Sequence, residues 1–270
     1  MKRRRLAALL CAILLLLGGG ISAEESAPAE DEALEEVILD EDDQEIPGEA
    51  GTREEAPAGV TAREDLINRI IELGEKLYTD ADGKRKRAHY ASDIYVCKNF
   101  TVYLFRQNRD DFRMAEYPDT KLVIPNNLPA KKCKPYAYGF LWEDVPAEKG
   151  NPFEVGAQFI YDPALSKEEN MALAMDFMRQ AQRGDFFQMS ADYEYGVGAH
   201  SAIMMRYDPE TDEIHWLDSN MRGGKKNGIR YGLVQYDAVK SVEWWASTFC
   251  HKKRGATLYR LREDIIYAGE

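Results

Sequence analysis

The sequence predicts an α+β fold in which N-terminal helices pack on a mostly antiparallel β-sheet. Three helical patterns, two of them opened by capping-box motifs, precede most of the strand-like segments. The strand-like segments are short, rich in β-branched and aromatic residues, and bounded by turn-forming residues. Helices that precede and flank a run of such strands are typical of the α+β class.

The first 58 residues are predicted to lie outside the folded domain. A basic start, an apolar run over 6–17 and a small-residue exit near Ala23 are typical of a secretory signal peptide over residues 1–23. The apolar run is shorter than the roughly 20 residues of a comfortable membrane span, and an uncleaved N-terminal anchor is the alternative. Residues 24–58 hold fifteen acidic residues, one basic residue and no aromatic residue, which indicates a disordered acidic tether.

The remaining residues, 59–270, form the predicted folded domain. The acidic tether outweighs the basic start of the chain and nearly accounts for the whole net charge of −12, so the domain itself is close to neutral. A basic stripe is the usual mark of a nucleic-acid-binding protein, and its absence from this sequence leads us to exclude nucleic acid as a partner. Thr61 to Glu64 is a capping box ahead of apolar residues at helical spacing, which predicts an amphipathic helix from about 62 to 78 docked on the domain.

A second helix is predicted to begin at Cys97 and to run to about Arg109, because Val102 and Phe105 give it an apolar face. A thiol at a helix N-terminus is favoured as thiolate by the positive end of the helix dipole and by unpaired backbone N–H groups. Cys97 is therefore the candidate nucleophile, and its own N–H is a candidate donor to an oxyanion. The candidates for a second oxyanion donor lie upstream: Tyr90, Ser92 and Tyr95.

The middle of the chain carries weaker signals before a third helix. Leu122 to Ile124 is a short strand candidate, 125–129 is a turn, and the aromatic stretch 136–142 is either a strand or a wall of a cleft. Ser166 to Glu169 is a capping box that opens a helix to about Arg183. Gly184 is expected in the left-handed conformation after this helix, and Phe186 to Met189 is expected to start the sheet.

His200 to Asp218 is predicted to form a β-hairpin around the turn Asp-Pro-Glu-Thr-Asp at 208–212. If the two aspartates of that turn face each other, His200 lies opposite Asn220, and Asp218 lies on the adjacent diagonal. Even-numbered residues then share one face, so the imidazole, the carboxylate and the amide project within mutual reach. This arrangement is the half of a nucleophilic triad that orients the imidazole. A one-residue bulge would change which of the two polar residues faces His200, so both stay candidates.

The chain after the hairpin is predicted to complete the sheet. Residues 221–228 form a flexible loop beside the candidate site. A strand over 231–236, a helix over 238–249 and a final strand over 256–261 follow.

Cysteine and histidine usage constrains the chemistry. Cys11 lies in the signal peptide, which leaves the odd number Cys97, Cys133 and Cys250 in the domain. An odd number in an exported domain suggests one reactive thiol and at most one disulfide, between Cys133 and Cys250. The histidines show no spacing suited to zinc, because His200 and His215 fall on opposite faces of their strands.

Four short motifs share residues and order with cysteine hydrolases: Cys-Lys-Asn-Phe at 97–100, Gly-Asp at 184–185, Gly-Ala-His-Ser at 198–201 and Asp-Ser-Asn at 218–220. Over residues 88–262 the chain thereby resembles the papain-like superfamily, especially NlpC-type endopeptidases, CHAP amidases and related bacterial amidases. CHAP domains often carry Glu-x-Asn where this chain has Asp-Ser-Asn, which leaves the third triad member open. The long interval between Cys97 and His200 implies an insertion near 110–160. Transglutaminase-like enzymes share the order Cys, His, Asp, and Trp-Leu-Asp at 216–218 is similar to their pattern.

The resemblance implies a papain-like catalytic domain and the activity of a cysteine peptidase or amidase. Cys97 would attack a carboxamide carbonyl, His200 would take and return the proton, and Asp218 or Asn220 would hold the ring while water hydrolyses the thioester. No cofactor and no metal ion is expected. Together with secretion, the resemblance implies a monomer at a bacterial cell envelope that acts on a peptide or peptidoglycan-stem amide. The alternatives are a transglutaminase-like acyl transferase and a non-catalytic wall- or protein-binding module on the same fold.

Overall fold

The computed structural model describes residues 59–80, 85–87, 95–125, 142–189, 200–221, 231–253 and 255–269, which belong to one compact unit spanning 31–270. Several predicted segments lie outside the described residues. They are the signal peptide, the acidic tether, the turn after Pro125, the aromatic stretch up to residue 141 and the loop over 222–228.

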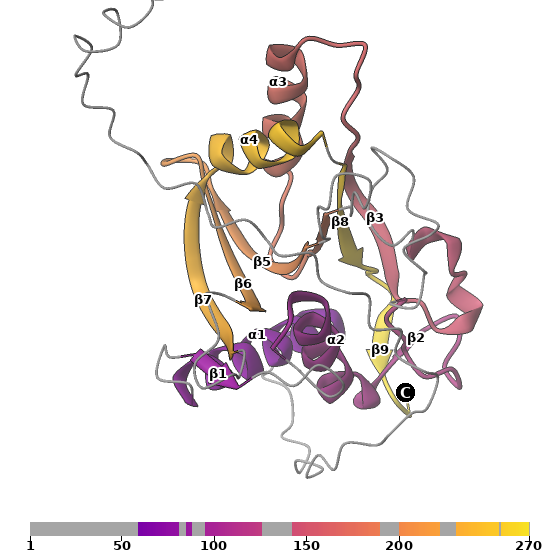
Figure 1. The fold of residues 1–270 in the computed structure, drawn as a ribbon. Helices are drawn as coiled ribbons and strands as arrows, with labels where there is room; N and C mark the ends of the chain where they lie inside the picture. The colour runs from indigo at the N-terminus through magenta and orange to yellow at the C-terminus, as the bar shows by residue number, and fades with distance from the viewer. Residues whose placement is uncertain are drawn as a thin grey trace, which may run out of the picture. The chain divides into compact units, whose positions relative to one another are not determined.

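Most of the described strands form one antiparallel sheet of order β1-β7-β6-β5-β4-β8-β3 (Figure 1). The strand bounds are β1 Arg85–Arg87, β3 Phe153–Phe159, β4 Phe186–Met189, β5 His200–Asp208, β6 Glu213–Met221, β7 Tyr231–Ser241 and β8 Ala256–Leu261. A second, two-stranded antiparallel sheet pairs β2 (Phe112–Met114) with β9 (Ile265–Tyr267). The predicted α+β class with an antiparallel sheet is therefore confirmed for the described part of the chain.

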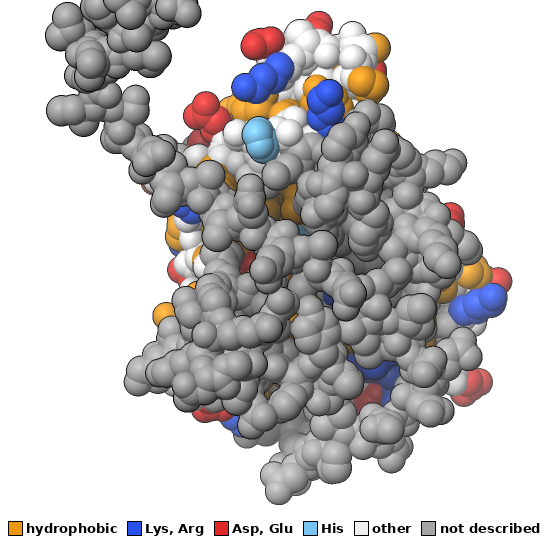
Figure 2. All heavy atoms as spheres, viewed as in Figure 1, with side chains coloured by type: hydrophobic (Ala, Val, Ile, Leu, Met, Phe, Trp, Pro, Cys, Tyr) orange, Lys and Arg blue, Asp and Glu red, His pale blue; other side chains and the backbone are white. Residues whose placement is uncertain are grey.

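The α-helices of the described residues lie in two pairs (Figure 1). One pair is α1 (Ala62–Asp80) with α2 (Cys97–Asn108), and the other is α3 (Lys167–Met178) with α4 (Val242–Lys252). Short 3₁₀ helices lie at Arg109–Asp111, Trp142–Asp144 and Ala147–Lys149. Figure 2 shows basic and acidic side chains interspersed over α3 and α4.

The middle of the main sheet is buried on both faces. In β4, Phe186 belongs to the apolar cluster that contains the α1 and α2 side chains, whereas Phe187 belongs to the cluster beneath α3 and α4. Because successive side chains of a strand point to opposite faces, neighbouring residues of β4 are all buried. This double coverage explains why β4 reads as a continuous apolar run and not as an alternating one.

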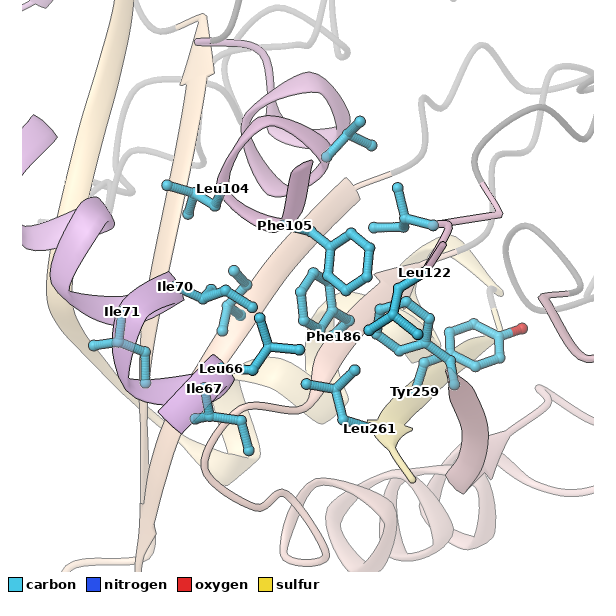
Figure 3. Packing of buried hydrophobic residues seen from close by; sticks show 14 of the residues in the cluster. Leu66, Ile67, Ile70, Ile71, Leu104, Phe105, Leu122, Phe186, Tyr259 and Leu261 are labelled. Atoms are coloured by element: carbon cyan, nitrogen blue, oxygen red, sulfur yellow. The ribbon is translucent and has the colours of Figure 1, made fainter. Parts of the chain in front are cut away.

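The predicted docking of the first helix is confirmed. The Glu64 N–H donates to Thr61 Oγ1 at 3.2 Å, and the Thr61 N–H donates to Glu64 Oε2 at 2.9 Å, which completes the capping box. The apolar face of α1 is buried against α2 and the sheet, as Figure 3 shows for Leu66, Ile67 and Ile70. Gly184 has a φ of 86°, as predicted, and a β-carbon there would come within 2.8 Å of the Ile67 side chain.

The third helix ends earlier than predicted. Its capping box at Ser166 and Glu169 is formed, but α3 stops at Met178 instead of continuing to about Arg183. The chain turns after the helix, where the Gln180 and Ala181 N–H groups donate to the Phe177 and Met178 carbonyls. Sheet pairing follows, with the Gly184 N–H donating to the Met204 carbonyl at 2.8 Å.

Three other predictions on secondary structure were wrong or incomplete. Residues 122–124 form no strand, although Leu122 and Ile124 are buried in the cluster with α1 and α2. Residues 238–241 belong to β7 and not to the following helix, because they pair with β6 over 213–216. Within the implied insertion, β3 was not anticipated, and it pairs with β8 at the edge of the sheet.

The β5–β6 hairpin reaches the predicted pairing near His200 through two compensating departures. Asp208 pairs with Glu213, one residue beyond the predicted partner Asp212, which has a left-handed φ of 55°. A bulge at Met205 then adds one residue to β5 and cancels the shift, so pairing beyond the bulge follows the predicted register.

Candidate active site

Cys97 is the first residue of α2, directly after the N-cap Val96. The helix packs on β5 and β6, and Cys97 is a reduced thiol that is 4% exposed. An α-helix leaves the N–H groups of its first turn without partners inside the helix, and the first turn of α2 carries no acidic side chain. The sulfur therefore lies at a helix end whose positive dipole is not neutralised locally.

His200 and Asp218 form a buried pair on neighbouring strands. The His200 Nε2 atom lies 2.9 Å from Asp218 Oδ2. The imidazole is 16% exposed and the carboxylate is 1% exposed, so solvent competes little for this contact. A buried carboxylate hydrogen-bonded to one ring nitrogen fixes the orientation of the imidazole. It also leaves Nδ1 as the ring nitrogen for a further partner.

The imidazole also hydrogen-bonds the Cys97 side chain. Burial alone lowers the pKa of His200, but hydrogen bonds to Asp218 and Cys97, together with their negative charges, raise it to about 10. The imidazole is therefore held between the thiol and the carboxylate, and its charged form is favoured over a wide pH range. The structure brings Cys97, His200 and Asp218 together.

Asn220 lies two residues after Asp218 on β6 and pairs with Leu233 of β7. Its side chain is half-buried. Of the two residues left open as the imidazole partner, Asp218 is the one that contacts His200 Nε2.

Gln235 is a residue of this site that sequence reasoning missed. It lies on β7, pairs with Asp218 on β6, and donates from Nε2 to Asp218 Oδ1 at 2.7 Å. The two oxygens of the buried carboxylate thus have separate partners, His200 and Gln235. The strand over 231–236 was predicted, but its register against β6 was not, so no signal in the sequence pointed to this contact.

The segment before Cys97 is tied to β6 and β7, which sequence reasoning also missed. Ser219 Oγ donates to the Tyr95 carbonyl at 2.8 Å. A β-carbon at Gly232 would lie 2.3 Å from Tyr95 Cβ and 2.7 Å from the Tyr95 carbonyl oxygen. Consecutive residues of β6 therefore hold the imidazole, through Asp218, and the chain leading to the thiol, through Ser219.

Gly232→Ala is expected to displace Tyr95 and with it the start of α2. The added methyl group meets backbone-proximal atoms and not a flexible side-chain end, so the strain should cost about 1–3 kcal/mol of stability. We expect slower alkylation of Cys97 by iodoacetamide in the folded variant. Ser219→Ala is the companion variant, since it removes the Tyr95 hydrogen bond without a clash and should give a smaller effect. Unchanged alkylation rates in both variants would show that this anchor does not position Cys97.

A second His–Asp pair joins β6 to β7, and its imidazole contacts a guanidinium instead of a thiol. His215 Nδ1 lies 2.6 Å from Asp237 Oδ1, and His215 Nε2 lies 3.1 Å from an Arg206 guanidinium nitrogen. A guanidinium only donates, so Nε2 accepts and the ring proton is on Nδ1, where it is donated to Asp237. Both ring nitrogens of His215 are therefore engaged.

The other predicted groups are placed as follows. Cys250 is a buried reduced thiol on α4. Its expected disulfide partner, Cys133, lies outside the described residues. The candidate oxyanion donors Tyr90 and Ser92 also lie outside them. The Tyr95 side chain packs against the core beneath α1 and α2. In the described ranges, no group of three or more His, Cys, Asp or Glu side chains is placed to hold a metal ion. None of the helices described here is both long and apolar enough to span a membrane.

The fold and the site together define an α+β protein in which a largely buried histidine contacts a buried cysteine and a buried aspartate. No protein-family model, curated protein or solved structure matches the chain.

Proposed function

We propose that this chain is a papain-like cysteine hydrolase that cleaves amide bonds, with Cys97 as nucleophile, His200 as acid and base, and Asp218 as the group that orients the imidazole. The observation that carries the proposal is the contact of one largely buried imidazole with both a helix-terminal thiol and a buried carboxylate. An ordinary buried histidine needs no such pair of partners, whereas an acid–base group beside a nucleophile does.

In the proposed reaction, the Cys97 thiolate attacks the carbonyl carbon of the amide, and the negative charge on the carbonyl oxygen is stabilised by N–H groups in the first turn of α2. The His200 imidazolium gives its proton to the departing amine, which leaves a thioester on Cys97. His200 then removes a proton from water as the water oxygen attacks the thioester carbon. The C–S bond breaks, which releases the carboxylic acid and restores the Cys97 thiolate beside the imidazolium. Asp218 keeps the ring oriented and stabilises its charged form throughout. This scheme needs no cofactor.

We further propose that the substrate is an amide in the peptide stems of a bacterial cell wall, because the N-terminal sequence has the pattern of an exported protein on an acidic tether. A peptide outside the cell is the other substrate of this class. The same placement puts the protein at the cell envelope or in the extracellular medium, and we propose that it acts there as a monomer.

The test is mass spectrometry of peptidoglycan incubated with the full-length protein, with and without prior iodoacetamide treatment. We expect fragments with one new amine and one new carboxyl end, lost when Cys97 is alkylated. Incorporation of an added primary amine ahead of water would identify an acyl transferase instead. Cleavage that persists with Cys97 fully alkylated would contradict the proposal, and absence of cleavage from any wall or peptide substrate would favour a binding module.

A further inference from the structure

The orientation of the Asp218 carboxylate depends on β7, a strand that carries none of the three proposed catalytic residues. We propose that Gln235 is a positioning residue for Asp218 and that a bulge at Asp237 places it there. The inference rests on the proposed function of the Cys97 site and extends it to the residues that set its geometry.

Gln235 restrains the carboxylate that holds the imidazole. Asp218 Oδ2 contacts His200 Nε2 at 2.9 Å, while Asp218 Oδ1 accepts from Gln235 Nε2 at 2.7 Å. Rotation of the carboxylate would break both contacts, so Gln235 selects the rotamer that aims Oδ2 at His200. Because Asp218 is fully buried, no bulk water replaces the amide donor when it is removed.

One extra residue in β7 places Gln235 beside Asp218. Toward the hairpin turn, Trp216 pairs with Ala238, but past the bulge Asp218 pairs with Gln235. Without the extra residue, the register of the Trp216–Ala238 pair would continue along the strands, and Tyr236 would face Asp218. Since a one-residue slip exchanges the two faces of a strand, Gln235 would then point away from the carboxylate.

The bulge residue Asp237 has a φ of 49°, in the left-handed region that Asp, Asn and Gly tolerate best. Its Oδ1 lies 2.6 Å from His215 Nδ1 and 3.5 Å from an Arg206 guanidinium nitrogen. His215 is buried and hydrogen-bonded to Arg206, so residues of both β6 and β5 hold the Asp237 side chain in place.

The same three side chains also flank the bulge in β5. Arg206 directly follows the bulge residue Met205, and it pairs with His215 on β6. The cluster Arg206–His215–Asp237 thus spans both bulges that set the register of β6 against its two neighbours. β6 is the strand that carries Asp218, so this cluster acts on the site through register and not through contact with His200.

The first test measures iodoacetamide labelling of Cys97 in the full-length protein as a function of pH. In Gln235→Leu the carboxylate loses its donor, so we expect labelling at neutral pH to slow by roughly tenfold and its pH profile to move toward alkaline pH. Gln235→Glu keeps the shape of the side chain but places a second carboxylate beside Asp218, and we expect at least the same loss. Gln158→Leu, the same change on the exposed edge of β3, is the matched control and should label at the wild-type rate.

The second test addresses the bulge. Asp237→Val, whose β-branched side chain disfavours a positive φ, is expected to slow labelling as much as Gln235→Leu does. The double variant Asp237→Val/Gln235→Leu should be no slower than either single variant, because both act through one contact. Asp237→Asn keeps an acceptor for His215 and tolerates the left-handed conformation, so it should restore labelling relative to Asp237→Val.

Two outcomes separate this inference from the proposed function. Wild-type labelling rates and pH profiles in folded Gln235→Leu and Gln235→Glu overturn the inference, whether or not the protein cleaves amides. Wild-type protein that labels at Cys97 but cleaves nothing contradicts the proposed function alone. If Asp237→Val does not fold, the two Gln235 variants still decide the role of Gln235. Asp237→Ala, which also disfavours a positive φ, then replaces Asp237→Val, and a wild-type labelling rate in folded Asp237→Ala would overturn the role of the bulge.

Discussion

Cys97→Ala is expected to abolish amide cleavage by the full-length protein, by at least about a thousandfold, while leaving the fold intact. The substitution removes only the sulfur from a buried position and keeps the β-carbon at the start of α2. His200 also loses one of the two partners that raise its pKa, so its pKa should fall from about 10. The measurements are turnover of wall peptides by mass spectrometry and titration of the imidazole by NMR.

Cys250→Ala is the matched control for this variant. Cys250 is as buried as Cys97, at 5% against 4% exposed, but it lies on α4 in the cluster beneath α3 and α4. Burial raises the pKa of the Cys250 thiol to about 11, so it stays protonated near neutral pH and should not react with iodoacetamide. Cleavage retained in Cys97→Ala would exclude Cys97 as the nucleophile.

Asp218→Asn is expected to reduce the rate of amide cleavage by roughly a hundredfold or more at neutral pH. The variant keeps the shape of the side chain but loses the negative charge that stabilises the His200 imidazolium. The pKa of His200 should therefore fall from about 10 toward its ordinary value of 6.5. NMR titration of the imidazole and the pH profile of Cys97 alkylation both report this change.

The same substitution should change how stability depends on pH. A pKa raised in the folded state means that the native protein binds this proton more tightly than the unfolded chain does. The contribution of His200 is thus fully present below about pH 6.5 and is lost as pH rises through about 10. We expect the free energy of unfolding of the wild type to decline over this window, and to decline less in Asp218→Asn.

Asp208→Asn, at the half-buried end of β5 far along the hairpin from His200, controls for the chemical change and should leave cleavage and the His200 titration as in the wild type. Should Asp218→Asn titrate His200 near pH 10 and cleave at the wild-type rate, the carboxylate would have no part in the site.

Local sequence patterns were sufficient for much of the fold. The capping boxes at Thr61 and Ser166 mark helix starts that the structure confirms, because the hydrogen bonds of a cap form within four residues. The hairpin of β5 and β6 follows from strand propensity on both sides of a turn. By contrast, the start of α4 was misplaced, because 238–241 had helical spacing but gained more by pairing with β6.

The candidate site was anticipated in part for the same reason. His200 and Asp218 lie on one hairpin, so their contact depends only on local strand register. The predicted register holds near His200 because the longer turn and the bulge at Met205 offset each other. Gln235 could not be anticipated, since its place beside Asp218 depends on an extra residue in a different strand.

The sequence by itself determined the helix that begins at Cys97 and the hairpin that carries His200 and Asp218, because each is specified by interactions among residues close in the chain. Only the tertiary structure decided that the thiol reaches the imidazole and that Gln235 holds the carboxylate. Both contacts join elements distant in sequence. Their geometry is fixed by how α2 packs on β5 and β6 and by bulges whose positions no local pattern encodes.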